Sequence, residues 1–386
     1  MLEQETVSSE EGAIKPELTS SHTRLLRELG IEKITLLSEP HRREWDDFIS
    51  HSRDSTFYHT VEWAELLQAG TGSVPSYWGL WSGGALAAIW PSFRTRAFGG
   101  NVLCFPYSTD GAPLMKDNAN PEHLNQIVKH ATSEAKKLNV LHWSMDVPKQ
   151  SRFATDALRL GFEEAESPRC AYLLDTTLDA EVLWNNFSHS VRRGIRRARA
   201  SGLEVVDSNE PADLAAFLSI YQSTMRRNQL SGFRNADSLI PYLTKLGVMG
   251  KAKLFVVKDK GMIVSGALLL LHKRTAHGWI AASRPESWTL RPNELLMWTT
   301  FEWASKFGYR MDLGGNPSDP KQGINRFKTQ LGGERVELIR LTLPIKYLQN
   351  LFCTALVQKY REVKHHGLVP EFISKTILKQ RNAWFD

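Results

Sequence analysis

The sequence has few cysteines and lacks the common motifs of covalent and metal-dependent catalysis. Cys104, Cys170 and Cys353 are too far apart for a disulfide framework or a cysteine zinc site. No His-x-x-x-His pair occurs, and the histidines show no metal-ligand spacing. Gly-x-Ser-x-Gly is also absent, and no cysteine stands in a recognisable nucleophile motif. We therefore expect neither a metal cofactor nor a covalent enzyme intermediate.

Long hydrophobic runs are also missing. The most apolar stretch, residues 263–271, is interrupted by Ser265 and Gly266, whereas a membrane-spanning helix needs about 20 apolar residues. The first residues are acidic where a secretion signal is basic, and no apolar segment follows them. We expect residues 1–30 to be a disordered tail and the protein to be cytoplasmic.

The residues that are present are typical of a folded protein of two or three domains. The 386 residues include 42% hydrophobic residues, 12 Trp and 17 Phe, enough for a large core. The formal net charge of +6 favours anionic partners without identifying one.

Much of the positive charge lies in one arginine cluster. Residues 190–202 predict a helix that ends at Gly202, on which Arg192, Arg196 and Arg199 form one stripe. Such a stripe is either a solvated basic face or a contact for phosphates, because guanidinium groups match phosphate oxygens. Both interpretations remain open at this point.

A second basic region lies at the C-terminus. Residues 345–386 predict amphipathic helices whose outer faces are basic. We expect them to pack on the body of the protein; peripheral contact with an anionic membrane surface is the less favoured alternative.

The chain also contains an internal duplication. Residues 77–90 and 253–271 each predict a β-hairpin, with turns at Gly83-Gly84 and Lys260-Gly261. A proline-started helix, a strand ending in Met-Asp and a Leu-Gly-x-Glu segment then follow in both copies, in the same order. The duplication predicts an α/β (α+β) fold in which each copy is a mixed twisted sheet flanked by helices.

This order of elements resembles the GNAT acyltransferase fold occurring twice, as in the FemABX family of aminoacyl-tRNA-dependent peptidyltransferases. The resemblance covers roughly residues 45–340, and its most specific part is Phe327-Lys328 followed by Leu331-Gly332-Gly333. It implies two GNAT-like domains at residues 31–170 and 171–342, followed by the C-terminal helical extension at 343–386. Two features of the family have no match here, the coiled-coil arm of the staphylococcal members and a lysine after Trp63.

The resemblance implies an enzyme that transfers an aminoacyl group to an amine of a cell-wall precursor or related envelope glycan. Aminoacyl-tRNA is the expected donor and a phosphate-bearing precursor the expected acceptor. Neither half has the glycine run by which GNAT enzymes usually bind the pyrophosphate of coenzyme A. An acyl-CoA-dependent N-acyltransferase of exopolysaccharide or lipid biosynthesis is the first alternative, and a non-catalytic nucleic-acid or partner-binding protein the second. Apart from the co-substrate, no cofactor is expected.

The candidate catalytic residues are Lys328 and Asp110. Lys328 can stabilise an oxyanion or a phosphate-bearing donor, and Asp110, in the loop from Pro106 to Pro113, can accept the proton of the acceptor amine. The alternatives are a surface lysine and an Asx-turn residue. The candidate substrate-binding residues are Tyr107, Arg192, Arg196, Asn293, Asp312 and Phe327.

For three of the candidate substrate-binding residues a structural role is the favoured interpretation. Phe327 matches Phe153 of the other copy and is expected to belong to the core. Asp312 and its counterpart Asp146 are duplicated, which indicates a structural role such as capping the following loop. Asn293 is expected in the first turn of a helix.

Overall fold

The computed structural model describes residues 31–34, 39–97, 100–106, 110–117, 120, 122–228, 230, 233, 235–317, 323–346 and 348. The elements of the first half are, in order, β1 (Ile31–Ile34), α2 (Glu39–His51), η1 (Phe57–His59), α3 (Val61–Thr71), β2 (Val74–Pro75), β3 (Tyr77–Ser82), β4 (Ala85–Trp90), β5 (Phe93–Ala97), β6 (Gly100–Cys104), β7 (Leu114–Met115), α4 (Glu122–Lys137), β8 (Val140–Pro148), α5 (Arg152–Ala157), η2 (Leu158–Leu160) and β9 (Glu163–Leu174).

The elements of the second half are α6 (Ala180–Asn186), α7 (His189–Ala200), β10 (Glu204–Asp207), α8 (Pro211–Arg227), η3 (Asp237–Leu239), α9 (Ile240–Val248), β11 (Ala252–Asp259), β12 (Met262–His272), β13 (Thr275–Ser283), η4 (Pro285–Leu290), α10 (Pro292–Phe307), β14 (Arg310–Asp312), β15 (Asn316–Pro317), α11 (Gly323–Gln330) and β16 (Glu334–Pro344).

Both predicted hairpins are present. β3 and β4 pair across Gly83 and Gly84, with φ of 60° and 78°, and β11 and β12 pair across Lys260 and Gly261, with φ of 48° and 81°. Two successive residues at positive φ are what a two-residue hairpin turn of type I′ requires. The turn residues therefore determine the hairpins locally.

The order helix, strand, short helix, strand occurs twice. It is formed by α4, β8, α5 and β9 in the first half and by α10, β14, α11 and β16 in the second, apart from η2 in the first half and the short strand β15 in the second. Pro292 stands in the first turn of α10, where its missing N–H costs no hydrogen bond. The expected mixed α/β fold of sheets flanked by helices is confirmed.

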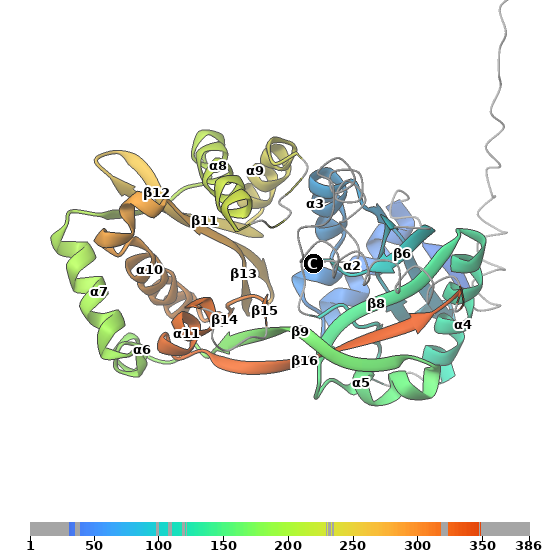
Figure 1. The fold of residues 1–386 in the computed structure, drawn as a ribbon. Helices are drawn as coiled ribbons and strands as arrows, with labels where there is room; N and C mark the ends of the chain where they lie inside the picture. Colours follow the sequence, from blue (N-terminus) through green and yellow to red (C-terminus); the bar gives the residue numbers. More distant parts are fainter. Residues whose placement is uncertain are drawn as a thin grey trace, which may run out of the picture.

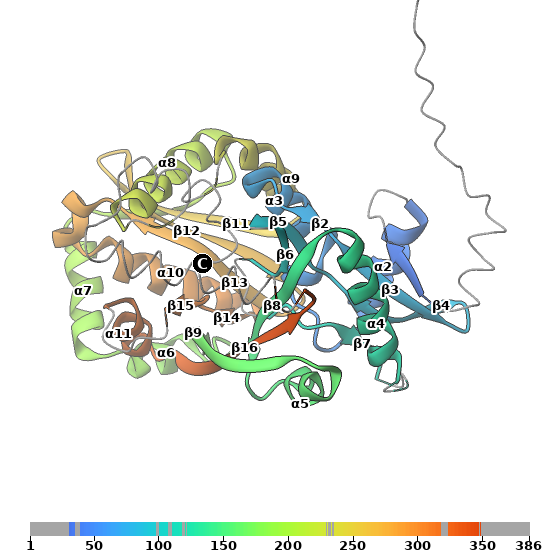
Figure 2. The same cartoon turned by 45° about the vertical axis from the view of Figure 1, so that its right-hand side comes forward.

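The last strand of each half pairs with the other half. The larger sheet has the order β10-β11-β12-β13-β14-β9-β16-β8-β6-β5-β2, so β9 lies beside β14 and β16 lies beside β8. β9 and β16 also pair antiparallel with each other, and Figures 1 and 2 show them running together between the halves. Each half therefore completes the sheet of the other, a topology that the sequence did not reveal.

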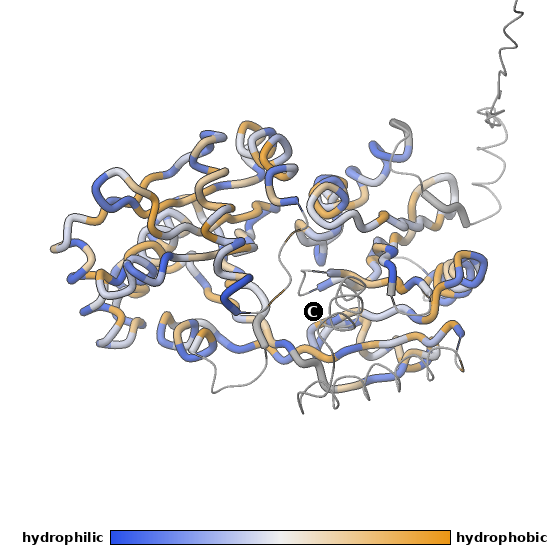
Figure 3. Tube along the Cα trace, turned by 45° about the horizontal axis from the view of Figure 1, so that its top comes forward, coloured by the Kyte–Doolittle hydropathy of each residue, from blue (hydrophilic) through white to orange (hydrophobic). Residues whose placement is uncertain are grey.

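The protein has two hydrophobic cores, and the first of them spans both halves through contacts between aromatic side chains. Trp63 of α3 contacts Trp279 of β13 with ring centroids 5.6 Å apart, and Phe233 packs on the same indole at 5.3 Å. A second core lies between α7, α10 and the opposite face of the second-half sheet. Along the outer helices hydrophobic and hydrophilic residues alternate, as expected for helices with one buried face (Figure 3).

The expected domain limits at residues 31–170, 171–342 and 343–386 stay predictions. The limit at residue 170 falls inside β9, which continues to Leu174. The tail at residues 1–30 and most of the C-terminal extension lie outside the described residues.

The buried ion pair between β8 and β16 supports a stability prediction. Arg340 donates to Asp146 through Nε and Nη2, both at 2.9 Å, and the Asp146 side chain is 4% exposed. Arg340→Leu leaves that carboxylate buried without its partner, so we expect the free energy of unfolding to fall by about 3–5 kcal/mol in urea denaturation. The matched control is Lys149→Leu, because Lys149 and Glu337 pair at the surface, 3.4 Å apart, where such pairs contribute about 0–1 kcal/mol. Equal losses in the two variants would contradict the prediction.

Candidate active site

A cavity of about 530 Å³ lies between the two halves. The first half contributes residues of η1, β8 and the end of β6, and the second half contributes residues of α8, β12, β13, α10, β14 and α11. β9 and β16, the exchanged strands, add Arg169 and Arg340. We call this the central cavity. A pocket of this size between two halves of a fold is a usual place for a small-molecule substrate.

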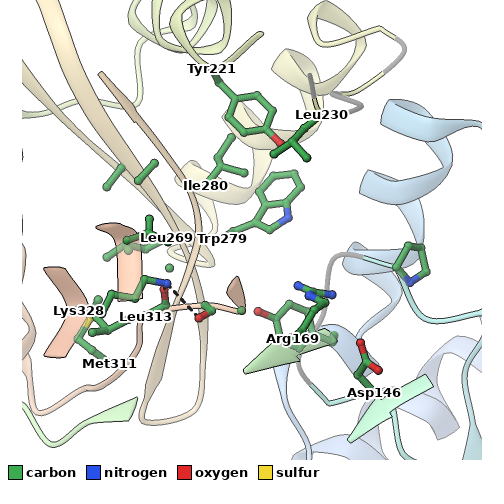
Figure 4. A pocket seen from close by; sticks show the side chains of 18 of the residues that line it. Asp146, Arg169, Tyr221, Leu230, Leu269, Trp279, Ile280, Met311, Leu313 and Lys328 are labelled. Carbon is green, nitrogen blue, oxygen red and sulfur yellow. Dashed lines mark hydrogen bonds between the residues drawn. The ribbon is translucent and has the colours of Figure 1, made fainter. Parts of the chain in front are cut away.

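Lys328 lies in the wall of the central cavity. Its Nζ donates hydrogen bonds to the backbone carbonyls of Leu313 and Gly314, the latter at 3.0 Å (Figure 4). The ammonium also lies 6.0 Å from the centroid of the Tyr172 ring. Burial lowers the pKa of Lys328 to about 8, an effect that nearby Asp312 partly opposes. Lys328 is therefore a positioned cation with a titratable proton, not the surface lysine of the alternative interpretation.

Asp312 lies close to Lys328, and both of its carboxylate oxygens have a hydrogen-bond partner. Its Oδ2 is 3.1 Å from Nδ1 of His277 on β13, and its Oδ1 accepts from the Gly314 amide at 2.8 Å. Burial alone would raise the pKa of Asp312, but the His277 and Gly314 hydrogen bonds outweigh it and lower the pKa. Asp312 thus caps the following loop, whereas its counterpart Asp146 pairs with Arg340 instead, and the His277 contact was not foreseen.

Asp110 lines a different cavity from Lys328. That cavity, of about 690 Å³, lies in the first half beside α5 and β16. Oδ1 of Asp110 accepts from the Ala112 amide at 3.3 Å, the contact of an Asx turn. The loop then packs tightly on Phe105: a Cβ on Gly111 would lie 2.3 Å from Cγ of that ring. Tyr107 lies outside the described residues.

The burial of Asp110 makes protein stability depend on pH. Desolvation raises the pKa of this carboxyl to about 6, partly offset by the Ala112 hydrogen bond. Because the pKa of Asp110 is higher in the folded than in the unfolded protein, its charged form destabilises the fold. This loss of folding free energy grows as pH rises from about 4 to about 6. Asp110→Asn should therefore raise the free energy of unfolding by about 2–3 kcal/mol at pH 7, with the gain vanishing below about pH 4.

Urea denaturation at a series of pH values measures this effect. Asp117→Asn is the control, because exposed Asp117 lines the same cavity and its substitution should change stability by less than about 0.5 kcal/mol. If Asp110→Asn raised the free energy of unfolding by the same amount at every pH, the raised pKa of Asp110 would not be the cause, and the prediction would be wrong.

A third cavity, of about 360 Å³, is lined by arginines. Arg193 and Arg197 of α7, Arg291 before α10 and Arg326 of α11 surround it, and among the described lining residues Glu294 is the one carboxylate. We call it the arginine cavity. Gly194 allows the close approach of α7 and α10, since a Cβ there would lie 3.1 Å from Cγ of Glu294. Three positive charges in excess suit a phosphate-bearing ligand.

The expected stripe of Arg192, Arg196 and Arg199 is not the one that lines the arginine cavity. Arg192 donates to the backbone carbonyls of Asn185 and Trp184, and Arg196 lies over the Trp184 ring at 5.7 Å. The phase of α7 is set by its apolar residues, which pack against α10 and leave positions 193 and 197 beside the cavity.

Phe327 and Asn293 complete the candidate set. Phe327 lines both the central cavity and the arginine cavity, besides packing against the second core. Asn293, in the first turn of α10, accepts from the Ser265 hydroxyl at 2.8 Å and donates to that of Ser283 at 3.2 Å. The structure thus places Lys328 and Phe327 in the lining of the central cavity, with Asp312 close to Lys328 but outside that lining. Asp110, Arg192, Arg196 and Asn293 also lie outside the lining of the central cavity.

Comparison with known proteins identifies the second half. Residues 185–329, which carry the arginine cavity and Lys328, match the family model described as an acetyltransferase (GNAT) domain. This segment is a GNAT-type acetyltransferase domain. The expected enzyme class, an acyltransferase, is confirmed by this match. No curated protein sequence matches the chain.

Solved structures resemble the whole described fold. FemX has a TM-score of 0.64 at 18% identity, covering 82% of this chain and 98% of that chain. A tandem GNAT protein from the clavulanic acid biosynthesis pathway has a TM-score of 0.55 at 12% identity, covering 82% and 98%. L-PGS from Bacillus licheniformis has a TM-score of 0.52 at 12% identity, covering 78% and 90%. At these identities the similarity establishes the fold.

The described residues contain no helix with the length and hydrophobicity that crossing a membrane requires. Within the same residues, no three His, Cys, Asp or Glu side chains are grouped as metal ligands.

Proposed function

We propose that the protein is an acyltransferase of the FemABX type. It transfers an aminoacyl group from tRNA to an amine of a cell-wall precursor or a related envelope molecule. The observation that carries the proposal is the position of Lys328, a half-buried cation in the wall of a cavity between two halves, next to a second cavity rich in arginine. The similarity of the fold to FemX supports it.

The arginine cavity binds the tRNA part of the donor, and the central cavity holds the ester carbonyl and the acceptor amine. Arg193, Arg197 and Arg326 bind the phosphates at the acceptor end of the tRNA, because guanidinium groups form paired hydrogen bonds with phosphate oxygens. Phe327 borders both cavities and stacks on a terminal base. The ester carbonyl then extends past Phe327 toward Lys328, where the acceptor amine meets it.

The reaction needs a neutral amine, a stabilised oxyanion and correct positioning. The amine attacks the ester carbonyl, a C–N bond forms, and the C–O bond to the ribose breaks. The proton lost by the amine ends on the released ribose hydroxyl. Lys328 stabilises the negative charge on the carbonyl oxygen. Because desolvation lowers the pKa of Lys328 to about 8, it can also transfer the proton from the amine to the ribose oxygen.

A second candidate function uses acyl-CoA as the donor. The arginine cavity beside the first turn of α10 is also suited to a pyrophosphate, and the family that matches residues 185–329 is described as an acetyltransferase domain. Saturable binding of acetyl-CoA, competing with charged tRNA, would favour this candidate.

Transfer of a labelled amino acid from charged tRNA to envelope amines tests the proposal, and its pH profile tests Lys328. Because the pKa of Lys328 is lowered to about 8, its cation is lost as pH rises through 8. We expect the rate to fall above about pH 8, whereas Lys328→Arg should keep its own, lower rate to higher pH. Salt-dependent tRNA binding without turnover, by contrast, would favour a non-catalytic binding protein.

A further inference from the structure

Apolar side chains lie around Lys328 in the wall of the central cavity. Nζ of Lys328 donates to the carbonyl of Leu313, whose side chain belongs to the second hydrophobic core. Leu269 of β12 and Met311 of β14 belong to the same core, and Figure 4 shows them next to the Lys328 side chain. We call this part of the central cavity the apolar recess; its lining residues are Leu269, Met297, Met311, Leu313, Ile324 and Leu331.

A glycine leaves room for the apolar recess. Gly278 of β13 pairs with Leu269 of β12, and a Cβ at Gly278 would lie 3.7 Å from Cα of Leu313. Any side chain at position 278 would therefore fill the gap between the two leucines. Ile324 borders the recess from α11, where it precedes Lys328 by four residues and so lies on the same face of the helix.

The apolar recess offers few hydrogen-bond partners to a polar group. Among the described residues of β12, α10, β14 and α11 that line the central cavity, Thr300 and Lys328 are the ones whose side chains carry nitrogen or oxygen. Thr300 donates its hydroxyl proton to the carbonyl of Leu296 at 2.8 Å, and an ammonium group accepts no hydrogen bond. A hydroxyl or amide bound there would lose its hydrogen bonds to water, whereas a hydrocarbon group gains free energy with each buried methylene.

The recess lies where the side chain of the transferred amino acid must be. In the proposed reaction Nζ of Lys328 binds the carbonyl oxygen of the donor ester. An amino-acid side chain begins two bonds away from its carbonyl carbon, so that it lies among the residues next to Lys328. The first-half side of the central cavity, which includes Tyr58 and Ser144, remains for the acceptor.

We propose that the apolar recess binds the side chain of the transferred amino acid, and that the enzyme thereby selects an apolar residue such as valine, leucine or methionine. A polar side chain of the same shape is rejected, because the recess leaves its hydroxyl or amide without a partner. This inference rests on the proposed function and deepens it, since it names the class of aminoacyl group that the same site accepts.

Binding of stable donor analogues to the whole protein tests the inference. Each analogue is a dinucleotide whose terminal adenosine carries the amino acid through a 3′-amide in place of the ester. Valine with threonine and leucine with asparagine are pairs of equal shape and different polarity, and a glycine analogue measures binding without a side chain. By calorimetric titration we expect valine to bind about 10–100-fold more tightly than threonine, and leucine more tightly than asparagine. Equal affinities within either pair, or affinities no higher than that of the glycine analogue, would overturn the inference.

Two variants test the location of the side-chain site. Ile324 is 47% exposed, so that Ile324→Gln adds an amide to the recess with little disturbance of the core, and Met297→Gln adds one from α10. Each should lower the preference for valine over threonine by about 3–10-fold, because the new amide can bind the threonine hydroxyl. Val248→Gln and Met262→Gln are the controls, since both residues are exposed and neither lines the central cavity. A reduction in either recess variant supports the location, and an unchanged preference in both would overturn the inference.

Transfer assays separate this inference from the proposed function. The same tRNA is charged with valine or with threonine, so that the nucleic acid is identical and only the side chain differs. If the analogues show the preference but neither amino acid is transferred, the proposed function fails and the recess remains a binding site for apolar side chains. If both amino acids are transferred at equal rates, the proposed function stands and the inference about the recess fails alone.

Discussion

Replacing Lys328 with methionine should lower the rate of acyl transfer by about 10²–10³-fold, the usual loss when one oxyanion donor is removed. Methionine keeps most of the length of the side chain but cannot donate to a carbonyl oxygen. Because Nζ of Lys328 also binds the carbonyls of Leu313 and Gly314, the variant must be shown to be folded. Thermal denaturation followed by circular dichroism provides that check, alongside the single-turnover rate with charged tRNA.

The control for this variant is Lys306→Met. Lys306 is exposed in the last turn of α10 and does not line any of the three cavities. The same loss of charge there should leave the rate within about twofold of the wild type. A folded Lys328→Met variant with more than half of the wild-type rate would show that Lys328 does not stabilise the transition state.

Neutralising Arg193 and Arg197 together should weaken binding of the donor by at least about 100-fold at low salt. Each guanidinium would lose charge-assisted hydrogen bonds to a phosphate, and such bonds contribute about 1.5–3 kcal/mol each. The logarithm of the binding constant should also depend less steeply on the logarithm of salt concentration, by about 1.5 for two phosphates. Filter binding or fluorescence anisotropy with labelled tRNA measures both quantities.

The matched control lies on the same helix. Arg196→Gln with Arg199→Gln removes the same charge from α7 at positions that do not line the arginine cavity. General electrostatic attraction would make the two double variants equally weak. A loss confined to Arg193→Gln with Arg197→Gln indicates a specific phosphate contact, and equal losses would contradict it.

The parts of the fold that depend on local chemistry were predictable from the sequence. Gly83-Gly84 and Lys260-Gly261 favour two-residue turns wherever they occur between apolar runs, and Pro292 favours the start of a helix. The repeated order of elements followed from these signals. The exchange of β9 and β16 did not, because it depends on pairing between strands far apart in the chain.

The candidate site was predictable where one side chain carries the chemistry. Phe-Lys before Leu-Gly-Gly resembles a known family and so predicts a role for Lys328, and the structure places this residue in the wall of the central cavity. The face of α7 was harder to predict, because its five arginines can form several stripes. The apolar positions Val191, Ile195 and Ala198 were the available signal, since they determine which side of α7 faces α10.

The grouping of Asp110 with Lys328 shows the limit of reasoning from loops. The loop indicates Asp110 and the Phe-Lys motif indicates Lys328, but nothing in the sequence gives the distance between the two residues. The pairing of His277 with Asp312 was missed for a similar reason. It follows from the parallel register of β13 and β14, which the spacing of histidines along the chain does not reveal.

The most direct test of the account is a crystal structure with a stable amide analogue of an aminoacylated tRNA end. The account predicts that its carbonyl oxygen lies within hydrogen-bond distance of Nζ of Lys328, with the neighbouring phosphates on Arg193 and Arg197. An analogue bound elsewhere, with Lys328 still directed only at the carbonyls of Leu313 and Gly314, would contradict it.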